Sequence, residues 1–240
     1  MPEPSPALAG RTILVTGASR GFGAAVAVAC AAAGAKLILT ARTRGALEET
    51  DDAVRKAGGE ATLIQLDLAD GELVDKLGAP LFERFGKLDG LVAAAAELGP
   101  LTPTSHLKPA DLERVMAINF VANQRLIRTL DPLLRVAEAG RAVFVTDAEA
   151  QRGRPYWGAY AASKQALESL VLGWAGETRL TNLKINLVDP GPMRTRLRVK
   201  AYPGEAAERN PLPELIAPGV VPLLAADCPH HGELVRLQAG

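Results

Sequence analysis

Apolar and polar positions form two alternating kinds of segment from residue 11 to the C-terminus. Short, mostly aliphatic runs predict strands buried on both faces of a sheet. They are RTILVTG (11–17), KLILTA (36–41), ATLIQLD (61–67), LDGLVAA (88–94), RAVFVTD (141–147), LKINLVD (183–189) and ELVRLQ (233–238). Between them lie patterns with helical periodicity, near 22–33, 44–57, 70–85, 109–137 and 158–180. The alternation predicts a single α/β domain whose parallel sheet carries helices on both faces.

Prolines set the two ends of the chain apart from this core. The first ten residues, MPEPSPALAG, contain three prolines and no basic segment, so we expect a disordered tail over 1–10 rather than a signal peptide. Residues 11–240 form the expected domain. After Pro190 the helical pattern stops, and further prolines predict an irregular segment over the sheet, around 191–218.

Charge and cysteine content exclude several classes of function. Basic and acidic residues number 27 each, so no net field attracts nucleic acid or an anionic membrane. No apolar run reaches the roughly 20 residues of a membrane helix. The cysteines Cys30 and Cys228 lie far apart without metal-ligand neighbours, which argues against a disulfide framework or a metal site and for a reducing cytosol. We therefore expect a cytoplasmic protein that binds a small molecule.

A glycine-rich turn, VTGASRGFGAAVAVAC, follows the first predicted strand and opens the first helix. Gly17, Gly21 and Gly23 permit a tight turn, close approach of a ligand to the backbone and close packing of helix on strand. Free N–H groups and the dipole at the start of the helix then favour a pyrophosphate. In this strand–turn–helix setting, the motif favours a dinucleotide site over a merely structural turn.

Tyr160 and Lys164 stand one turn apart in the helix predicted over 158–180, so their side chains share a face. An ammonium about 5 Å from a phenol stabilises the phenolate by roughly 3 kcal/mol at an effective dielectric near 20, or about two pK units. Such a tyrosine can act as acid or base near neutral pH. A surface or packing role is the alternative for a pair at this spacing.

The spacing TGxxxGxG at residues 16–23, together with YxxxK at 160–164, resembles the short-chain dehydrogenase/reductase family, and the likeness covers about residues 11–238. The resemblance implies a Rossmann-like, doubly wound parallel sheet of seven strands and a nicotinamide cofactor. It also implies a homodimer or homotetramer. The irregular segment around 191–218 would cover the substrate.

The resemblance also implies roles for single residues. Asn119, in MAINFVAN, matches the asparagine that helps to hold a water for proton relay to the lysine, and Asp67 matches the aspartate that contacts the adenine amino group. In VDPGPMRTRL, Pro190 and Gly191 would shape the turn beside the nicotinamide. Thr195 would contact the carboxamide or the pyrophosphate.

The end of the second predicted strand, LILTART, bears on the choice of cofactor. An NAD site usually has an acidic residue here, which binds the ribose 2′-hydroxyl, whereas this chain has Ala41 followed by Arg42. Arg20 in the glycine turn is a second guanidinium, and two guanidiniums suit a 2′-phosphate. We therefore expect NADP(H) rather than NAD(H), with solvated arginines as the alternative. The expected cofactor-binding residues are Gly17, Ser19, Arg20, Gly21, Phe22, Gly23, Arg42, Asp67, Lys164, Pro190, Gly191 and Thr195.

Asp147 stands thirteen residues before Tyr160, at the position of the family's serine, which hydrogen-bonds the substrate oxygen. An ionised carboxylate cannot donate that bond, and it would raise the pKa of Tyr160. The neighbouring Thr146 should point to the other face of the strand. Three arrangements would preserve chemistry: a protonated Asp147, a pair with Arg152 or Arg154, or a bond accepted from a substrate hydroxyl or amine.

A second departure follows the fourth predicted strand, where LVAAAAELGPL has Ala94 and Ala96 at the outer positions of the family's Asn-Ala-Gly motif. This change removes a buried polar group and adds a methyl near the cofactor. Before the catalytic helix, Tyr156 and Trp157 are candidates for an aromatic substrate wall, with packing or an oligomer contact as the alternative. Several arginines could attract an acidic substrate, or pair with Glu149 and Glu205; they are Arg152, Arg154, Arg194, Arg196 and Arg198.

Together these features predict an NADP(H)-dependent oxidoreductase that transfers hydride between nicotinamide and a carbonyl or secondary alcohol. The expected catalytic residues are Tyr160, Lys164, Asn119 and Asp147, and no metal is expected. A catalytically weak or silent NADP(H)-binding protein, acting as a sensor or as a subunit of an assembly, is the alternative.

Overall fold

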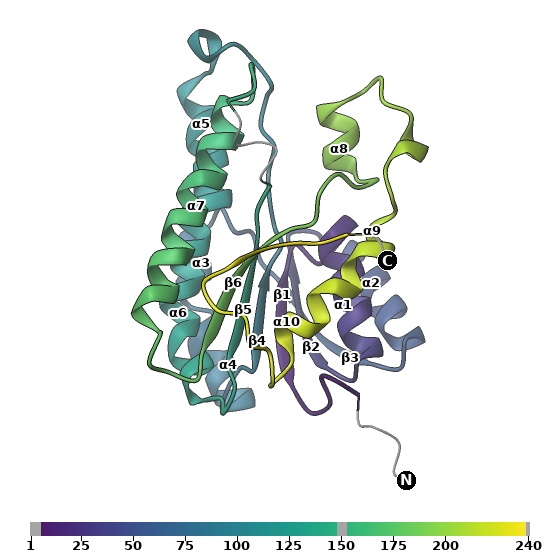
Figure 1. The fold of residues 1–240 in the computed structure, drawn as a ribbon, viewed down its shortest axis with the longest axis vertical. Helices are drawn as coiled ribbons and strands as arrows, with labels where there is room; N and C mark the ends of the chain where they lie inside the picture. The colour runs from purple at the N-terminus through teal and green to yellow at the C-terminus, as the bar shows by residue number, and fades with distance from the viewer. Residues whose placement is uncertain (1–5, 148–152, 239–240) are drawn as a thin grey trace.

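The computed structural model describes residues 6–147 and 153–238. Its centre is one sheet of seven parallel strands in the order β3-β2-β1-β4-β5-β6-β7 (Figure 1). The strands are β1 (Thr12–Thr16), β2 (Lys36–Ala41), β3 (Glu60–Gln65), β4 (Gly90–Ala93), β5 (Arg141–Val145), β6 (Lys184–Asp189) and β7 (Leu234–Arg236). The predicted seven-stranded, Rossmann-like α/β fold is thus confirmed.

Helices cover both faces of this sheet, and each face encloses its own buried aliphatic cluster (Figure 1). One face carries α1 (Gly21–Ala32), α2 (Arg44–Lys56) and the short C-terminal helices α9 (Pro213–Ile216), η4 (Ala217–Val220) and α10 (Val221–Leu224). The other carries α3 (Gly71–Asp75), α4 (Gly78–Phe85), α6 (Ala122–Val136) and α7 (Gly158–Glu177). Within the ranges described, no helix combines the length and apolar character needed to cross a membrane.

Two of the predicted helices are interrupted. The pattern over 70–85 forms α3 and α4, because Pro80 lacks the N–H of a continuous helix and its ring would meet the carbonyl of residue 76. The pattern over 109–137 forms α5 (Pro109–Met116) and α6, which are joined by a π-helical turn, η2 (Ala117–Val121). Such wide turns often occur at functional sites, and this one contains Asn119.

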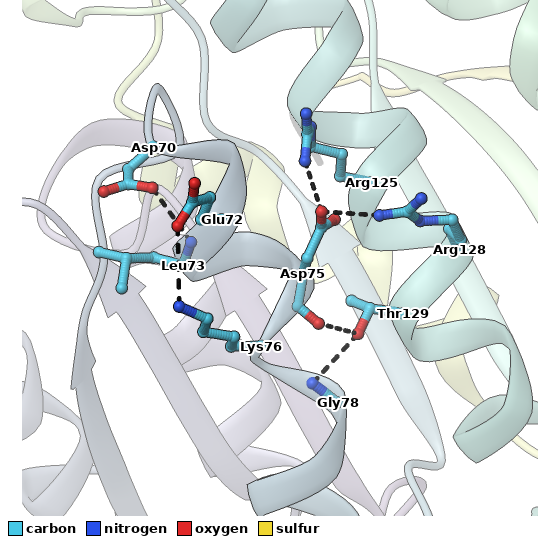
Figure 2. A network of polar contacts seen from close by, with 9 residues as sticks. All are labelled: Asp70, Glu72, Leu73, Asp75, Lys76, Gly78, Arg125, Arg128 and Thr129. Carbon is cyan, nitrogen blue, oxygen red and sulfur yellow. Dashed lines mark hydrogen bonds and ion pairs between the residues drawn. The ribbon is translucent and has the colours of Figure 1, made fainter.

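A polar network holds α3 and α4 against α6 (Figure 2). One carboxylate oxygen of Asp75 lies 2.5 Å from Arg125 Nη1 and 2.7 Å from Arg128 Nη2. The Asp75 carbonyl accepts the Thr129 hydroxyl at 3.1 Å, and that hydroxyl accepts the Gly78 N–H at 3.2 Å. The hydrogen bond from Arg128 and the charge of Arg125 lower the pKa of Asp75. The connection between β3 and β4 is thereby tied to the helix beside it.

Residues 6–10 pack against α1. Leu8 is fully buried, and its N–H donates to the Ala33 carbonyl at 2.9 Å. These five residues belong to the domain rather than to the tail that we expected, whereas 1–5 lie outside the described ranges. Hydrophobic burial of Leu8 outweighs the turn-forming composition around it.

The segment around 191–218 divides into two parts. Its first part contains α8 (Arg196–Ala201) and η3 (Ala207–Arg209), which stand apart from the sheet (Figure 1). Its second part, from Pro213 onward, packs on α1. Only the first part is therefore placed to cover a ligand at the edge of the sheet.

Candidate active site

A cleft of about 980 Å³ opens at the carboxyl ends of the strands. The strand order reverses between β1 and β4, and open parallel sheets bind ligands at such a point. Every expected catalytic and cofactor-binding residue lines this cleft except Asn119. Segments that are distant in the sequence, from the glycine turn to α8, therefore meet around one space.

The glycine-rich turn leaves no space for side chains. A Cβ on Gly17 would lie 2.7 Å from the Ala95 Cα, and a Cβ on Gly23 would lie 2.4 Å from the Gly17 carbonyl oxygen. Helix α1 begins at Gly21, and no side chain caps its first N–H groups. A Cβ on Gly21 would come within 3.5 Å of the Thr195 methyl group across the cleft. The start of α1 therefore offers backbone donors to an anion, and Thr195 stands close beside it.

Charged side chains line the cleft beside β2 and β3. Arg20 and Arg42 are both exposed there. Arg42 Nη1 lies 4.0 Å from a carboxylate oxygen of Glu97. Asp67 also lines the cleft, and its Oδ1 accepts the Ala69 N–H at 3.0 Å. This end of the cleft combines two guanidiniums with two carboxylates.

Lys164 reaches the cleft from α7 and is only 2% exposed. Its Nζ donates to the Val145 carbonyl at 2.8 Å and lies 5.7 Å from the centroid of the Tyr160 ring. Burial lowers the pKa of Lys164 to about 8, although the charges of Asp147 and Glu168 oppose this shift. Lys164 is therefore predominantly protonated at neutral pH.

Tyr160 is 4% exposed and lies one helical turn before Lys164. Burial raises the pKa of Tyr160, and the charges of Asp147 and Asp189 raise it further. From the sequence, Lys164 was expected to lower this pKa and an ionised Asp147 to raise it, whereas the burial of the ring and the charge of Asp189 were not visible. Burial and the two carboxylates outweigh the lysine, so Tyr160 is a neutral phenol at neutral pH.

Asp147 follows β5 and lines the cleft, where its charge acts on Tyr160 and Lys164. Thr146 also lines the cleft, and its hydroxyl donates at 2.6 Å to Glu168 Oε1 on α7, the helix that carries Tyr160. Arg154, one of the two partners considered for Asp147, lines the same cleft. The other, Arg152, lies outside the described residues.

Asn119 lies behind the cleft and is fully buried. Its Oδ1 accepts the Glu97 N–H at 2.8 Å, while its Nδ2 donates to the Glu97 carbonyl and to Ser163 Oγ, each at 2.9 Å. Ser163 in turn donates to the Tyr160 carbonyl at 2.7 Å. The side chain therefore clamps the loop after β4 to α7. The proton relay inferred from the resemblance stays a prediction.

Ala94 and Ala96 both line the cleft. Strand β4 nevertheless keeps its parallel register with β1 and β5. The clamp from Asn119 to the backbone of Glu97 holds the loop that follows these alanines. The loop after β4 is therefore held without a polar side chain at either alanine position.

Aromatic rings form one wall of the cleft. The Trp157 ring lies 5.8 Å from the Tyr160 ring and 5.7 Å from the Tyr202 ring, between centroids. The Arg198 guanidinium stacks 3.8 Å from the Tyr202 centroid. Trp157 thus contributes to the wall proposed from the sequence, whereas Tyr156 is 57% exposed and does not line the cleft.

The sequence alone did not reveal Tyr202 or Glu97 as residues of the site. Tyr202 lies in the irregular segment, where no periodicity shows which side chains face inward. Glu97 was visible as a charge directly after a run of alanines. The pairing of Arg198 with Glu205, one of the alternatives for the arginines, is confirmed by two bonds of 2.6 Å; Glu149 lies outside the described residues.

The fold and the cleft define a class: a dinucleotide-binding α/β protein with a Tyr–Lys pair beside the ligand site. The family model for short chain dehydrogenases matches residues 11–206. The uncharacterized oxidoreductase YciK of Escherichia coli K12 is 33% identical over 220 residues, which cover 90% of this chain and 87% of YciK. The chain belongs to the short chain dehydrogenase family.

Solved structures agree with this assignment. A short chain dehydrogenase from Pseudomonas syringae superposes with a TM-score of 0.93 at 38% identity, covering 98% of this chain and 97% of that one. A short chain dehydrogenase from Shigella flexneri 2a, complexed with NADP, gives a TM-score of 0.92 at 33% identity, covering 97% and 98%. The likeness therefore extends over the whole domain.

Proposed function

We propose that the protein is an NADP(H)-dependent oxidoreductase that transfers hydride between nicotinamide and a carbonyl or secondary alcohol. One observation carries this proposal: a single cleft joins the start of α1 and two arginines, Arg20 and Arg42, to the Tyr160–Lys164 pair. Family membership supports the reaction class, and the NADP complex of the Shigella relative supports the cofactor class. The preference for NADP(H) rests on the two guanidiniums, which suit a 2′-phosphate.

The residues of the cleft fit such a cofactor. The start of α1, whose first N–H groups no side chain caps, suits a pyrophosphate. Thr195 Oγ1 accepts the Arg198 N–H at 3.2 Å and keeps its own proton, which it can donate to a phosphate or a carboxamide. Gly191 and Lys164 line the opposite end. When bound there, a nicotinamide supplies or accepts the hydride.

Tyr160 would exchange the proton with the substrate oxygen. Its raised pKa keeps it a phenol, which is the form that donates a proton during carbonyl reduction. The ammonium of Lys164 stabilises the phenolate that this step leaves behind. Oxidation of an alcohol requires the phenolate at the start and is therefore disfavoured near neutral pH.

We take Asp147 to occupy the substrate-oxygen position in an unusual form. When ionised, it accepts a hydrogen bond from a substrate hydroxyl or amine, and when protonated, it donates one to a carbonyl. A catalytically silent NADP(H)-binding protein is the alternative that this residue suggests. Membership in an oxidoreductase family does not favour that alternative. We also propose a cytoplasmic homodimer or homotetramer, from the composition and the family resemblance.

Tyr160→Phe tests the proposed function. Phenylalanine retains the ring that packs on Trp157 and removes only the hydroxyl. We expect NADPH to bind with a Kd within about twofold of the natural value. Turnover of a ketone panel, followed by NADPH oxidation, should fall by about 10²- to 10⁴-fold. Tyr156→Phe, at an exposed position outside the cleft, is the matched control.

Binding can be followed by energy transfer from Trp157 and Trp174 to the reduced nicotinamide. Turnover that persists in Tyr160→Phe would contradict the assignment of the acid. Tight NADPH binding by the natural protein, without turnover of any ketone in the panel, would support the silent alternative instead.

A further inference from the structure

Glu97 lies between two guanidiniums at the end of the cleft beside β2 and β3. Its Oε1 is 2.9 Å from Arg114 Nε, and its Oε2 is 4.0 Å from Arg42 Nη1. The first contact is a charge-assisted hydrogen bond, whereas the second lies at the outer limit of an ion pair. Arg114 therefore holds the carboxylate firmly, and Arg42 is held only loosely.

The position of this carboxylate is fixed from behind. Asn119 bonds both the N–H and the carbonyl of Glu97 through its buried amide. On the solvent side, Arg114 projects from α5 onto the same carboxylate. The Glu97 side chain is 25% exposed, so its charge is only partly screened by water. The Glu97 carboxylate is thereby kept within reach of Arg42.

We propose that Glu97 tunes the selectivity of the site between NADP(H) and NAD(H) by competing for Arg42. This inference rests on the proposed binding of NADP(H). A 2′-phosphate carries between one and two negative charges and binds a guanidinium through short, charge-assisted bonds. It takes Arg42 from Glu97, because the present contact is long. Glu97 also repels that phosphate, and Arg114 limits the repulsion by pairing with Glu97.

A cofactor without the 2′-phosphate neither competes with Glu97 for Arg42 nor is repelled by Glu97. Its 2′-hydroxyl is uncharged, so it neither displaces Arg42 from Glu97 nor experiences strong repulsion from the carboxylate. Glu97 therefore weakens the binding of NADP(H) but not of NAD(H), and so reduces the preference for NADP(H) that Arg20 and Arg42 create. Removal of Glu97 should widen that preference.

Glu97→Gln tests this selectivity, because the substitution removes the charge and keeps both backbone bonds to Asn119. Calorimetry on the full chain should show the Kd of NADPH, and of the fragment adenosine 2′,5′-bisphosphate, falling about fivefold. The Kd of NADH should stay within about twofold. The gains in affinity for NADPH and for the bisphosphate should shrink in high salt, because screening weakens the competing charges.

Two further variants sharpen the comparison. Arg114→Gln releases Glu97 to bind Arg42 more strongly, so NADPH should bind about fivefold more weakly while NADH changes little. Glu60→Gln makes the same charge change at the opposite end of the sheet, where Glu60 lies 3.7 Å from Lys36, and should leave both Kd values unchanged.

The outcomes separate the inference from the function on which it rests. If the natural protein binds NADPH and Glu97→Gln leaves that Kd unchanged, the inference is overturned while the proposed function stands. If Glu97→Gln weakens NADH instead, Glu97 binds the ribose hydroxyls and the inference is equally overturned. A natural protein that binds neither cofactor overturns the proposed function itself. Thermal unfolding shows that each variant is folded before its Kd is compared.

Discussion

Replacement of Asp147 by serine tests whether a carboxylate at the substrate end of the cleft opposes catalysis by Tyr160. Burial raises the pKa of Tyr160, and the charge of Asp147 raises it further, which makes the phenol a weaker acid. Asp147→Ser removes that charge and supplies a hydroxyl that can donate to a carbonyl oxygen. Both changes favour reduction of a simple ketone, so we expect the variant to be faster than the natural protein.

The size of the gain follows from the dimensions of the site. Two unit charges separated by 5.7 Å, the distance from Lys164 Nζ to the Tyr160 ring, interact by about 3 kcal/mol at an effective dielectric of about 20. A carboxylate at a similar distance from Tyr160 destabilises the phenolate by a similar energy. With roughly half of that energy expressed in the transition state of proton transfer, kcat should rise about tenfold at neutral pH.

The assay is a pH–rate profile of ketone reduction for the natural protein, Asp147→Ser and Asp147→Asn. The basic limb should move to lower pH in both variants, because loss of the carboxylate lowers the pKa of Tyr160 and of Lys164. Asp147→Asn preserves size and isolates the effect of charge. Slower turnover in both variants, with an unmoved basic limb, would refute this reasoning and make Asp147 a contributor to catalysis.

Three other changes should have measurable effects. Burial lowers the pKa of Lys164 to about 8, and the charge of Glu168 opposes that shift. Glu168→Gln should therefore lower this pKa further, and activity in a pH–rate profile should decline at a lower pH than in the natural protein. Gly23→Ala places a Cβ 2.4 Å from the Gly17 carbonyl oxygen. The free energy of unfolding, measured by denaturant titration, should fall by about 1–3 kcal/mol, and NADPH should bind more weakly. A hydrogen bond from Arg198 lowers the pKa of Glu205 to about 2. The ion pair therefore stabilises the fold above about pH 4.5, and this stabilisation is lost as the pH falls toward 2. An NMR titration of the Glu205 carboxyl group measures this pKa.

Each of these expectations has an outcome that contradicts it. A basic limb unchanged in Glu168→Gln would show that this carboxylate does not act on Lys164. A Gly23→Ala variant with natural stability and natural NADPH affinity would mean that the turn relaxes without cost. A Glu205 carboxyl that titrates near its ordinary pKa of 4.5 would mean that the ion pair does not form in the folded protein.

The strands and the glycine-rich turn could be predicted because their signals are local. Aliphatic runs, the glycines and the Tyr160–Lys164 spacing each lie within one short segment. One missed feature was local as well: Pro80 marks the break between α3 and α4, since proline cannot continue the preceding helix. Helical periodicity alone had merged the two.

The rest depends on contacts between distant segments. The pKa of Tyr160 follows from burial and from two carboxylates that end different strands, and no segment of the sequence contains both. Asn119, in the π-helical turn, bonds to the backbone of Glu97, a residue of the loop after β4 that lies 22 residues earlier in the sequence. Leu8 belongs to the core because its side chain packs in the buried cluster that includes α1, which the local sequence does not reveal.

The hydrogen bonds from Asn119 hold the loop at residue 97 whichever side chain stands there. Asn119 bonds only backbone atoms of Glu97, and every amino acid except proline presents the same pair. Mutations at this position can therefore change the charge above the cleft while the loop keeps its course. If Glu97 acts as proposed, directed evolution could change cofactor affinity through this position without disturbing the fold.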